Sequence, residues 1–314
     1  MLQPLAIRPV LYIVVIVMAL IGAYAFKLRT EGVFSCTAEG YRADRYMGYC
    51  NGSAYGDYDH GAVWFGLEPG VQQYAADADV LFLGSSRMQF AFSTIATDKW
   101  FAAQTASHYL LGFTHTENVS FTAPLLALLK PRAKVYIINV DRFFSDDETG
   151  PGSEILHDKN ISQRYLEKWR WQQLHRLVCR KFARICGRKF AYFRAVRTGH
   201  FVERGVNKID AAPVTEGPSS GQDQWDHYKA LAEEFVAKLP VDRACVILTL
   251  VPYPKTRTAE AQAIASSLGL ELITPRLEGL RTHDGSHLDK PSTELWSQAF
   301  FDLAGARIQQ CLKR

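Results

Sequence analysis

The chain has 314 residues, of which 47% are hydrophobic and 22% charged. This composition supports one large α/β domain with appendages or two smaller domains, and it excludes a globally disordered chain. The formal net charge of +4 is uneven, because residues 164–197 carry eleven Lys and Arg against one acid, Glu167. Such a local basic block indicates an anionic neighbour more strongly than the overall charge does.

The N-terminal segment, residues 1–30, contains seventeen consecutive uncharged residues at 10–26, with Lys27 and Arg29 directly after them. The run is short for a membrane span and long for a signal-peptide core. Three interpretations stay open: an uncleaved single-span anchor, which we favour, a cleaved signal segment at the A-Y-A of 23–25, or a buried core helix. The first two place the remaining chain in the periplasm or extracellular space, either membrane-anchored or secreted. The flanking charges are too balanced to fix the orientation.

Six cysteines, an even number, suit an oxidising compartment. The predicted couples are Cys36–Cys50, Cys179–Cys186 and Cys245–Cys311. The first would staple residues 31–76, which are rich in Gly, Tyr and Asp and which we expect to be irregular. The second can form only if the helix breaks between its members, because seven residues of straight helix span about 10 Å. No cysteine or histidine spacing is typical of zinc, so we expect neither a metal nor an organic cofactor.

From residue 77 to 314 the pattern alternates between strand and helix. Strands are predicted over 79–84, 100–112 (with a turn), 133–141 and 243–252, and helices over 122–131, 227–240 and 292–312. Residues 258–274 are predicted to form a helix, a glycine cap and a short strand. Ser292 and Thr293 are available to cap the last helix. The alternation predicts a three-layer α/β/α, doubly wound parallel sheet of flavodoxin-like type. The basic block, about 155–215, is expected to be a helical insertion or lid.

Polar residues follow several of the predicted strands. Gly84-Ser85-Ser86-Arg87 follows the first strand, and Asn139-Val140-Asp141 lies at the end of the 133–141 strand. The stretch 284–289, D-G-S-H-L-D, precedes the last helix. Gly112 ends the second strand and is followed by Thr114 and Glu117 at capping-box spacing. In an open α/β sheet these groups converge at the carboxyl edge, where ligands bind.

This set has the logic of nucleophilic catalysis. A serine hydroxyl reacts only after a base removes its proton, and the imidazole of His287 suits that role near neutral pH. Asp284, three residues earlier, can hold the other ring nitrogen of His287. The backbone N–H groups of Ser86 and Gly112 and the amide of Asn139 are the right type of donor for an oxyanion.

Other polar residues near these segments allow several roles. His283 is the rival base, although we expect it to be exposed. His108 and His115 are expected to make local polar or substrate contacts. Arg87 would bind a substrate anion or pair with Asp141, and Asp141 is either that structural partner or part of the rim of the site.

The order of these motifs resembles the SGNH (GDSL-type) hydrolase superfamily over roughly residues 77–314. Gly84-Ser85-Ser86 matches the family's Gly-Asp-Ser block, so the resemblance implies that Ser86, and not Ser85, is the nucleophile. Gly112 and Asn139 match the second- and third-block residues, and Asp284 and His287 match the D-x-x-H block. Ser85 replaces the usual Asp, and Asn-Val-Asp replaces the usual Gly-x-Asn-Asp. The "GSSR" form with an N-terminal anchor is similar to members found beside polysaccharide O-acylation systems.

The resemblance implies an extracytoplasmic serine esterase or O-acyltransferase that works through an acyl-enzyme. Its substrate would be an acylated cell-surface glycan or a small ester, and a membrane acyltransferase is a possible partner. The alternative is a catalytically inactive SGNH-like module that binds a glycan or assists an acyltransferase.

The basic block is a solvated face, or it contacts an acidic glycan or the membrane. A nucleic-acid partner is not expected for an exported protein.

Overall fold

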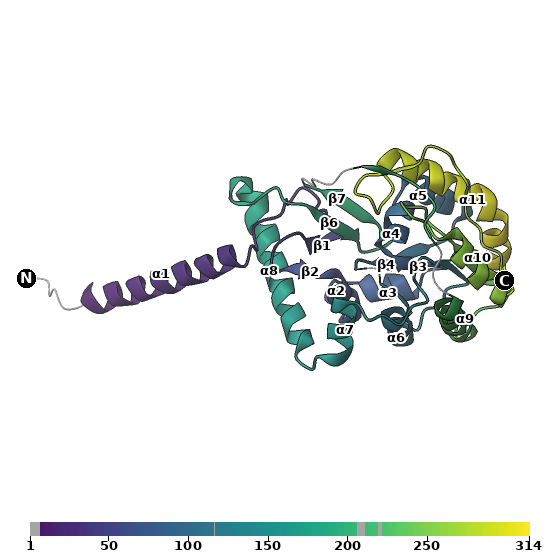
Figure 1. Ribbon diagram of the computed structural model, residues 1–314. Helices are drawn as coiled ribbons and strands as arrows, with labels where there is room; N and C mark the ends of the chain where they lie inside the picture. The colour runs from purple at the N-terminus through teal and green to yellow at the C-terminus, as the bar shows by residue number, and fades with distance from the viewer. Residues whose placement is uncertain (1–6, 116, 206–210, 219–221) are drawn as a thin grey trace, which may run out of the picture.

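A computed structural model describes residues 7–115, 117–205, 211–218 and 222–314 (Figure 1). Helix α1 (Ile7–Thr30) projects away from the body. Its stretch Pro9–Thr30 is long and apolar enough to cross a membrane, and its most apolar window is not buried inside the protein. The structure therefore contradicts a buried core helix and leaves an anchor or a signal segment for this part of the chain.

The centre of the protein is a four-stranded parallel sheet in the order β4-β3-β5-β9. Its strands are β3 (Val80–Ser85), β4 (His108–Phe113), β5 (Val135–Asn139) and β9 (Val246–Thr249), and every residue in them is buried. Apolar runs buried on both faces are what a parallel sheet requires. The chain passes from β3 to β4 on one side and then crosses back to β5, so the strand order reverses at β3, where a crevice forms at the carboxyl edge.

Helices cover both faces of this sheet (Figure 1). One face packs on α4 (Ser86–Phe92), α5 (Ile95–Gln104) and α11 (Lys290–Leu312). The other packs on α3 (Val71–Ala76), α6 (Val119–Leu129), α9 (Gln222–Ala237) and α10 (Thr258–Ser267). Side chains alternate between the two cores, as Leu81 and Phe82 do. The expected mixed α/β architecture with a parallel sheet is confirmed.

A second, antiparallel sheet in the order β2-β1-β6-β7 corrects two predictions. Residues 31–76 are not irregular, since they form β1 (Arg45–Cys50), β2 (Gly56–Asp57), α2 (Asp59–Trp64) and α3. The insertion is not wholly helical. It holds α7 (Gly150–His157), α8 (Ile161–Lys181) and the turn η1 (Ala183–Ile185), then β6 (Ala191–Ala195) and β7 (Phe201–Arg204). Residues 206–210 of the insertion lie outside the described residues.

A buried arginine links the second sheet to the outer edge of β4, beside a backbone hydrogen bond in which the N–H of Leu110 donates to the carbonyl of Thr198 at 2.9 Å. The guanidinium of Arg194 on β6 donates to both carboxylate oxygens of Asp59 on α2, with an Nη2–Oδ2 distance of 2.8 Å, and both side chains have no exposed surface. It also donates to the carbonyls of Leu110, at 2.7 Å, and Gly112 on β4. The planar guanidinium, with five donors, satisfies all four of these acceptors at once, whereas the ammonium of a lysine has only three donors.

Three local predictions are wrong, because other residues cap the helices concerned. Helix α5 occupies 95–104, where a strand was expected to start, because Thr94 caps it and accepts the N–H of Thr97 at 3.0 Å. Thr114 and Glu117 do not form a capping box, since Thr114 donates to Asp57 and Asn118 caps α6. Asp289, rather than Ser292 or Thr293, caps α11 by accepting the N–H of Ser292.

Two short pieces complete the fold, the turn η2 (Arg243–Cys245) and the pair β8 (Ala212–Pro213) with β10 (Arg281–Thr282).

All three predicted disulfides are present. Cys36–Cys50 joins the chain after α1 to the end of β1. Cys179 and Cys186 pair because α8 ends at Lys181 and the chain then turns through η1, which brings the two Cα atoms to 5.8 Å. Cys245–Cys311 ties the start of β9 to the end of α11. The disulfides are consistent with a domain outside the cytoplasm.

We expect Arg194→Met to lower the free energy of unfolding by about 3–5 kcal/mol, because it leaves the Asp59 carboxylate buried without its partner. Urea unfolding followed by circular dichroism measures this loss. Arg197→Met is the matched control, since Arg197 is an exposed arginine three residues away and should change the stability by less than about 0.5 kcal/mol. Adding Asp59→Leu to Arg194→Met should recover part of the loss; a further loss would contradict this account.

Candidate active site

Ser86 lies where β3 meets α4. Ser85 ends the strand and caps the helix, with its Oγ accepting the N–H of Arg87 at 3.3 Å, and Ser86 is the first helical residue. Gly84 has φ of 155°, and a Cβ there would stand 3.1 Å from the Cβ atoms of both Asn139 and Met88. Only glycine fits this corner without strain. The corner therefore places the Ser86 hydroxyl at the carboxyl edge of the sheet.

Ser86, His287 and Asp284 form one hydrogen-bonded chain. The Nε2 atom of His287 is 2.8 Å from Oγ of Ser86, and its Nδ1 atom is 2.6 Å from Oδ2 of Asp284. The other carboxylate oxygen, Oδ1, accepts the backbone N–H of His287 at 2.8 Å, so the turn 284–287 fixes both residues. These distances are those required of a nucleophile, a base and an orienting group.

The charge of Asp284 sets the tautomer of His287. Burial would raise the pKa of Asp284, but the hydrogen bond and charge of His287 dominate and hold that pKa well below its usual range. An ionised carboxylate only accepts hydrogen bonds, so Nδ1 of His287 carries a proton and Nε2 is left to accept the Ser86 hydroxyl.

A pocket of about 320 Å³ contains Ser86, Asp284 and His287. Much of its wall comes from the second sheet and the segments beside it. The remaining lining residues are Tyr49, Asn51, Phe90, Thr114, His115, Phe190, Tyr192 and Glu203. The rings of Tyr49 and Tyr192 stack with their centroids 5.4 Å apart, and the ring of Phe90 meets that of His287 edge-on at 4.6 Å. Sequence reasoning missed Tyr49, Tyr192 and Glu203, because it did not predict the sheet that carries them.

Arg87 and Asp141 pair with each other rather than line this pocket. The Arg87 Nη1 donates to Asp141, its Nε donates to Oγ of Ser286 at 3.1 Å, and its guanidinium lies 3.8 Å from the ring centroid of Tyr253. Arg87 therefore ties the chain after β5 to the 284–287 turn. This is the pairing that the sequence offered as the alternative to binding a substrate anion.

His115 does line the pocket, in a left-handed conformation with φ of 61°. A buried ionic network lies behind it. His60 is 2.9 Å from Oδ1 of Asp57 and 2.7 Å from Oε2 of Glu117, and Thr114 donates to the other oxygen of Asp57 at 2.6 Å. Burial would lower the pKa of His60, but the charges and hydrogen bonds of the two carboxylates raise it to about 10. The charged His60 thus binds Glu117 directly and Thr114 through Asp57.

The three predicted oxyanion donors lie in different environments. The N–H of Ser86 belongs to the first turn of α4, where backbone N–H groups have no partner within the helix. Gly112 and Asn139 sit in the strands on either side of β3, and neither lines the pocket. Asn139 is fully buried: its Oδ1 accepts the N–H of Val251 at 3.0 Å, while its Nδ2 has no partner among the described residues.

His283 is half-buried rather than exposed, which corrects the prediction. Its Nε2 is 3.3 Å from Oε1 of Glu203 and 3.6 Å from Oδ2 of Asp284. The nearby carboxylate of Glu203 is the main reason that the pKa of His283 rises to about 9, against the opposing effect of burial. A histidine that is already protonated at neutral pH cannot take a proton from Ser86, which weakens His283 as the rival base.

His108 lies away from this pocket. It is buried, its Nε2 is 3.0 Å from Nε2 of His200, and its ring stacks on Phe101 with centroids 4.2 Å apart. Burial lowers the pKa of His108 to about 4, so it stays neutral. Of the two roles expected for His108, the structure shows a local polar contact, with His200, and not a contact in this pocket.

Three groups of side chains in the described part of the chain are close enough to share a metal ion. The group at His175 has its two cysteines joined in a disulfide, and the group at His287 is already engaged by hydrogen bonds. In the third, Asp98, His108 and His200, the two imidazoles bond to each other at 3.0 Å. Two nitrogens on a tetrahedral zinc would stand about 3.4 Å apart. None of the three groups presents ready metal ligands.

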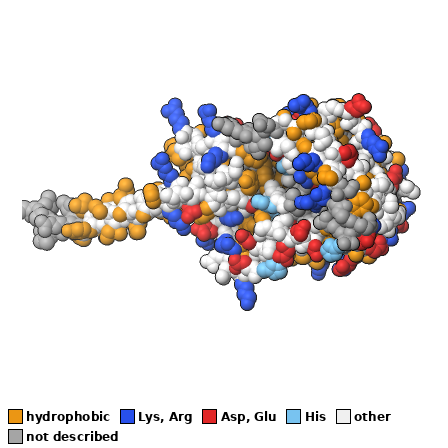
Figure 2. Space-filling model, viewed as in Figure 1, with side chains coloured by type: hydrophobic (Ala, Val, Ile, Leu, Met, Phe, Trp, Pro, Cys, Tyr) orange, Lys and Arg blue, Asp and Glu red, His pale blue; other side chains and the backbone are white. Residues whose placement is uncertain are grey.

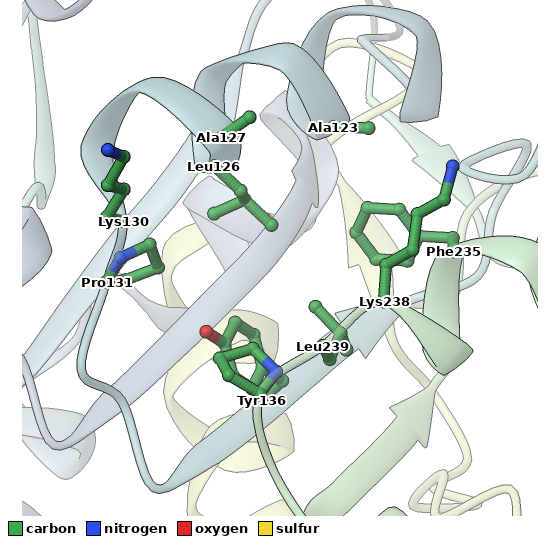
Figure 3. Close-up of a pocket in the computed structure, with 10 residues that line it drawn as sticks. Ala123, Leu126, Ala127, Lys130, Pro131, Tyr136, Phe235, Lys238 and Leu239 are labelled. Atoms are coloured by element: carbon green, nitrogen blue, oxygen red, sulfur yellow. The ribbon is translucent and has the colours of Figure 1, made fainter.

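A separate cavity of about 370 Å³ opens between α6 and α9 on the other side of the sheet (Figure 3). Leu126, Phe235 and Leu239 surround it and Tyr136 of β5 lies at its base, with Lys130 and Lys238 at the rim. It contains no pairing of a nucleophile with a base, so we assign no chemistry to it.

Comparisons of the chain with family models, with curated proteins and with solved structures find no match.

The pKa of His283 provides a test of the geometry around the pocket. We expect its NMR titration midpoint to lie near 9 and to fall toward the ordinary value of 6.5 in Glu203→Gln, because the neutral amide no longer stabilises the imidazolium. The raised pKa contributes stability that is complete below pH 6.5 and is lost as the pH rises through about 9.

The control for this titration is Glu148→Gln, which removes a carboxylate 2.8 Å from the exposed His157. It should leave the titration of His283 unchanged. A midpoint that stays near 9 in Glu203→Gln would show that Glu203 is not the cause.

Proposed function

We propose that the protein is an extracytoplasmic serine esterase or O-acyltransferase of the SGNH type, with a three-layer α/β/α core and α1 as its membrane anchor. The observation that supports this most directly is the continuous hydrogen-bonded chain of Ser86, His287 and Asp284 inside a pocket. A lone serine turn or a lone D-x-x-H turn is common, but a chain of three groups at these distances has the geometry of acyl transfer.

In the proposed reaction the Ser86 oxygen attacks the carbonyl carbon of an ester while Nε2 of His287 takes the hydroxyl proton. The tetrahedral intermediate collapses, His287 gives the proton to the departing alkoxide, and the acyl group stays on Ser86. Water or a sugar hydroxyl then attacks the acyl carbon as His287 takes its proton. The bond from that carbon to the Ser86 oxygen breaks, and His287 returns the proton to Ser86. Asp284 stabilises the imidazolium in both halves. Water as acceptor gives an esterase, and a sugar hydroxyl gives a transferase.

The oxyanion would be held first by the N–H of Ser86, to which the resemblance adds Gly112 and Asn139. The unpaired Nδ2 of Asn139 is a donor of the required kind beside Gly84. The aromatic rings of the pocket offer flat surfaces to the substrate. We propose acyl groups of a cell-surface glycan as the substrate class, with a small ester as the simplest form and a membrane acyltransferase as a partner.

A second candidate function, a catalytically silent module that binds a glycan or assists an acyltransferase, is favoured by one observation. Gly112 and Asn139 do not line the pocket, which leaves one of the three expected oxyanion donors beside it. Loss of one such donor typically costs about 10²–10³ in rate, so a site without two of them would bind without efficient turnover.

Labelling with a fluorophosphonate distinguishes the two functions. We expect the purified protein to be labelled at Ser86, as mapped by mass spectrometry, and Ser86→Ala to lose the label. His287→Ala should slow labelling by about 10²-fold or more, because no base then activates the hydroxyl. Ser85→Thr is the control, since it keeps a capping oxygen and should retain the label. A folded wild-type protein that takes up no label would exclude the enzyme.

An acyl-release and acyl-transfer assay separates esterase from transferase. We expect release of acetate from small acetyl esters in water, and transfer of the acetyl group to an acidic polysaccharide when one is supplied. Ser86→Ala should abolish both, because they share the acyl-enzyme. Release that is unaffected by added polysaccharide would identify the esterase, and release that persists in Ser86→Ala would contradict the assignment of the nucleophile.

A further inference from the structure

Three exposed apolar side chains occur within residues 177–185, at and just after the end of α8. Leu177, Phe182 and Ile185 are each 59% exposed, and we call them the apolar tip. The Cys179–Cys186 disulfide closes the turn that carries Phe182 and Ile185, and Leu177 lies in α8 two residues before that turn. Most of the tip is therefore part of a constrained loop rather than a free chain end. Apolar side chains gathered on an exposed loop indicate a surface that is covered by something else.

The tip is surrounded by positive charge. The exposed basic residues on and after the end of α8 are Arg180, Lys181, Arg184, Arg188 and Lys189. The sequence contains no acidic residue from 168 to 202. Apolar side chains among basic ones are typical of segments that lie in the interface of an anionic bilayer. A soluble polyanion would neutralise the basic residues but would leave the apolar tip in water.

The tip lies beside the base of α1. The N–H of Gly187 donates to the carbonyl of Phe34 at 2.8 Å, and the N–H of Lys189 donates to that of Ser35 at 3.2 Å. Helix α1 ends at Thr30, only a few residues earlier. Figure 1 shows α8 at the end of the body nearest α1, and Figure 2 shows Lys and Arg side chains gathered at the same end. If α1 spans a membrane, this loop is held at the membrane surface.

We propose that the apolar tip and its basic residues insert into the interface of an anionic phospholipid bilayer beside α1. The proposal rests on the anchoring role of α1 proposed above. A single helix would leave the domain free to rotate about its own stalk. A second contact through the tip fixes the orientation of the body, and with it the height and direction of the Ser86 pocket relative to the membrane. The occupant is therefore the headgroup and upper acyl-chain region of phospholipids.

Photolabelling of the full chain in vesicles tests this proposal. The vesicles contain a phospholipid with a diazirine in its acyl chain, mixed into phosphatidylcholine with or without phosphatidylglycerol. We expect mass spectrometry to find the label in α1 and in the tip, with more on the tip when phosphatidylglycerol is present. Leu295 and Leu303 of α11 are the internal control, because they are 60% and 59% exposed but lie on the helix farthest from α1 in Figure 1.

A variant with Arg180→Gln, Lys181→Gln and Arg184→Gln tests the contribution of charge. Each removed charge should lower the local binding equilibrium about fivefold, so the tip should lose most of its label while α1 keeps its own. Label on α1 but not on the tip in wild-type protein overturns the proposal and leaves the anchor standing. No label on either segment overturns both, and equal label on the tip and on Leu295 and Leu303 overturns the specific contact.

Discussion

The arrangement of the two sheets depends on the buried guanidinium of Arg194. Strand β4 is an edge strand whose outward carbonyls at Leu110 and Gly112 would otherwise lack partners, and such an edge needs to be covered. Arg194 satisfies both carbonyls and holds Asp59 at the same time, so its charge is balanced without water. Because β6 is thereby fixed against β4, Tyr192 stands across the pocket from the corner that carries Ser86.

The pocket is consequently shared between two structural units. The parallel sheet supplies Ser86, and the 284–287 turn supplies His287 and Asp284, while the antiparallel sheet supplies part of the wall and the carboxylate of Glu203. Glu203 also determines the charge of His283, which in turn lies 3.6 Å from Asp284. The second sheet thus affects the electrostatics of the proposed catalytic turn as well as the shape of the pocket. Any motion that separated the sheets would change both properties together.

The sequence predicted what depends on neighbouring residues or on the general geometry of parallel sheets. The strands at 80–85, 135–139 and 246–249 are continuous apolar runs, and Asp284 and His287 belong to one turn, so their contact needs no knowledge of the fold. The pairing of β1 with β6 places Tyr46 opposite Arg194, almost 150 residues later. No pattern in the neighbouring sequence predicts a pairing over this distance. The charged His60 was missed for the same reason, since its partner Glu117 comes from a distant segment.

The antiparallel sheet and α8 both lie next to the C-terminal end of α1. The antiparallel sheet is connected to α1 through residues 31–44 and through the Cys36–Cys50 disulfide, and α8 packs beside the same junction, with Lys27 3.5 Å from Glu167. In Figure 1 the antiparallel sheet and α8 lie between α1 and the parallel sheet. If α1 and the apolar tip contact a bilayer, the antiparallel sheet joins that contact to the pocket, with Arg194 as the buried link to the strand beside β3. The membrane, the pocket wall and Ser86 would then keep one fixed geometry, which the proposed reaction would require for a substrate held at a surface.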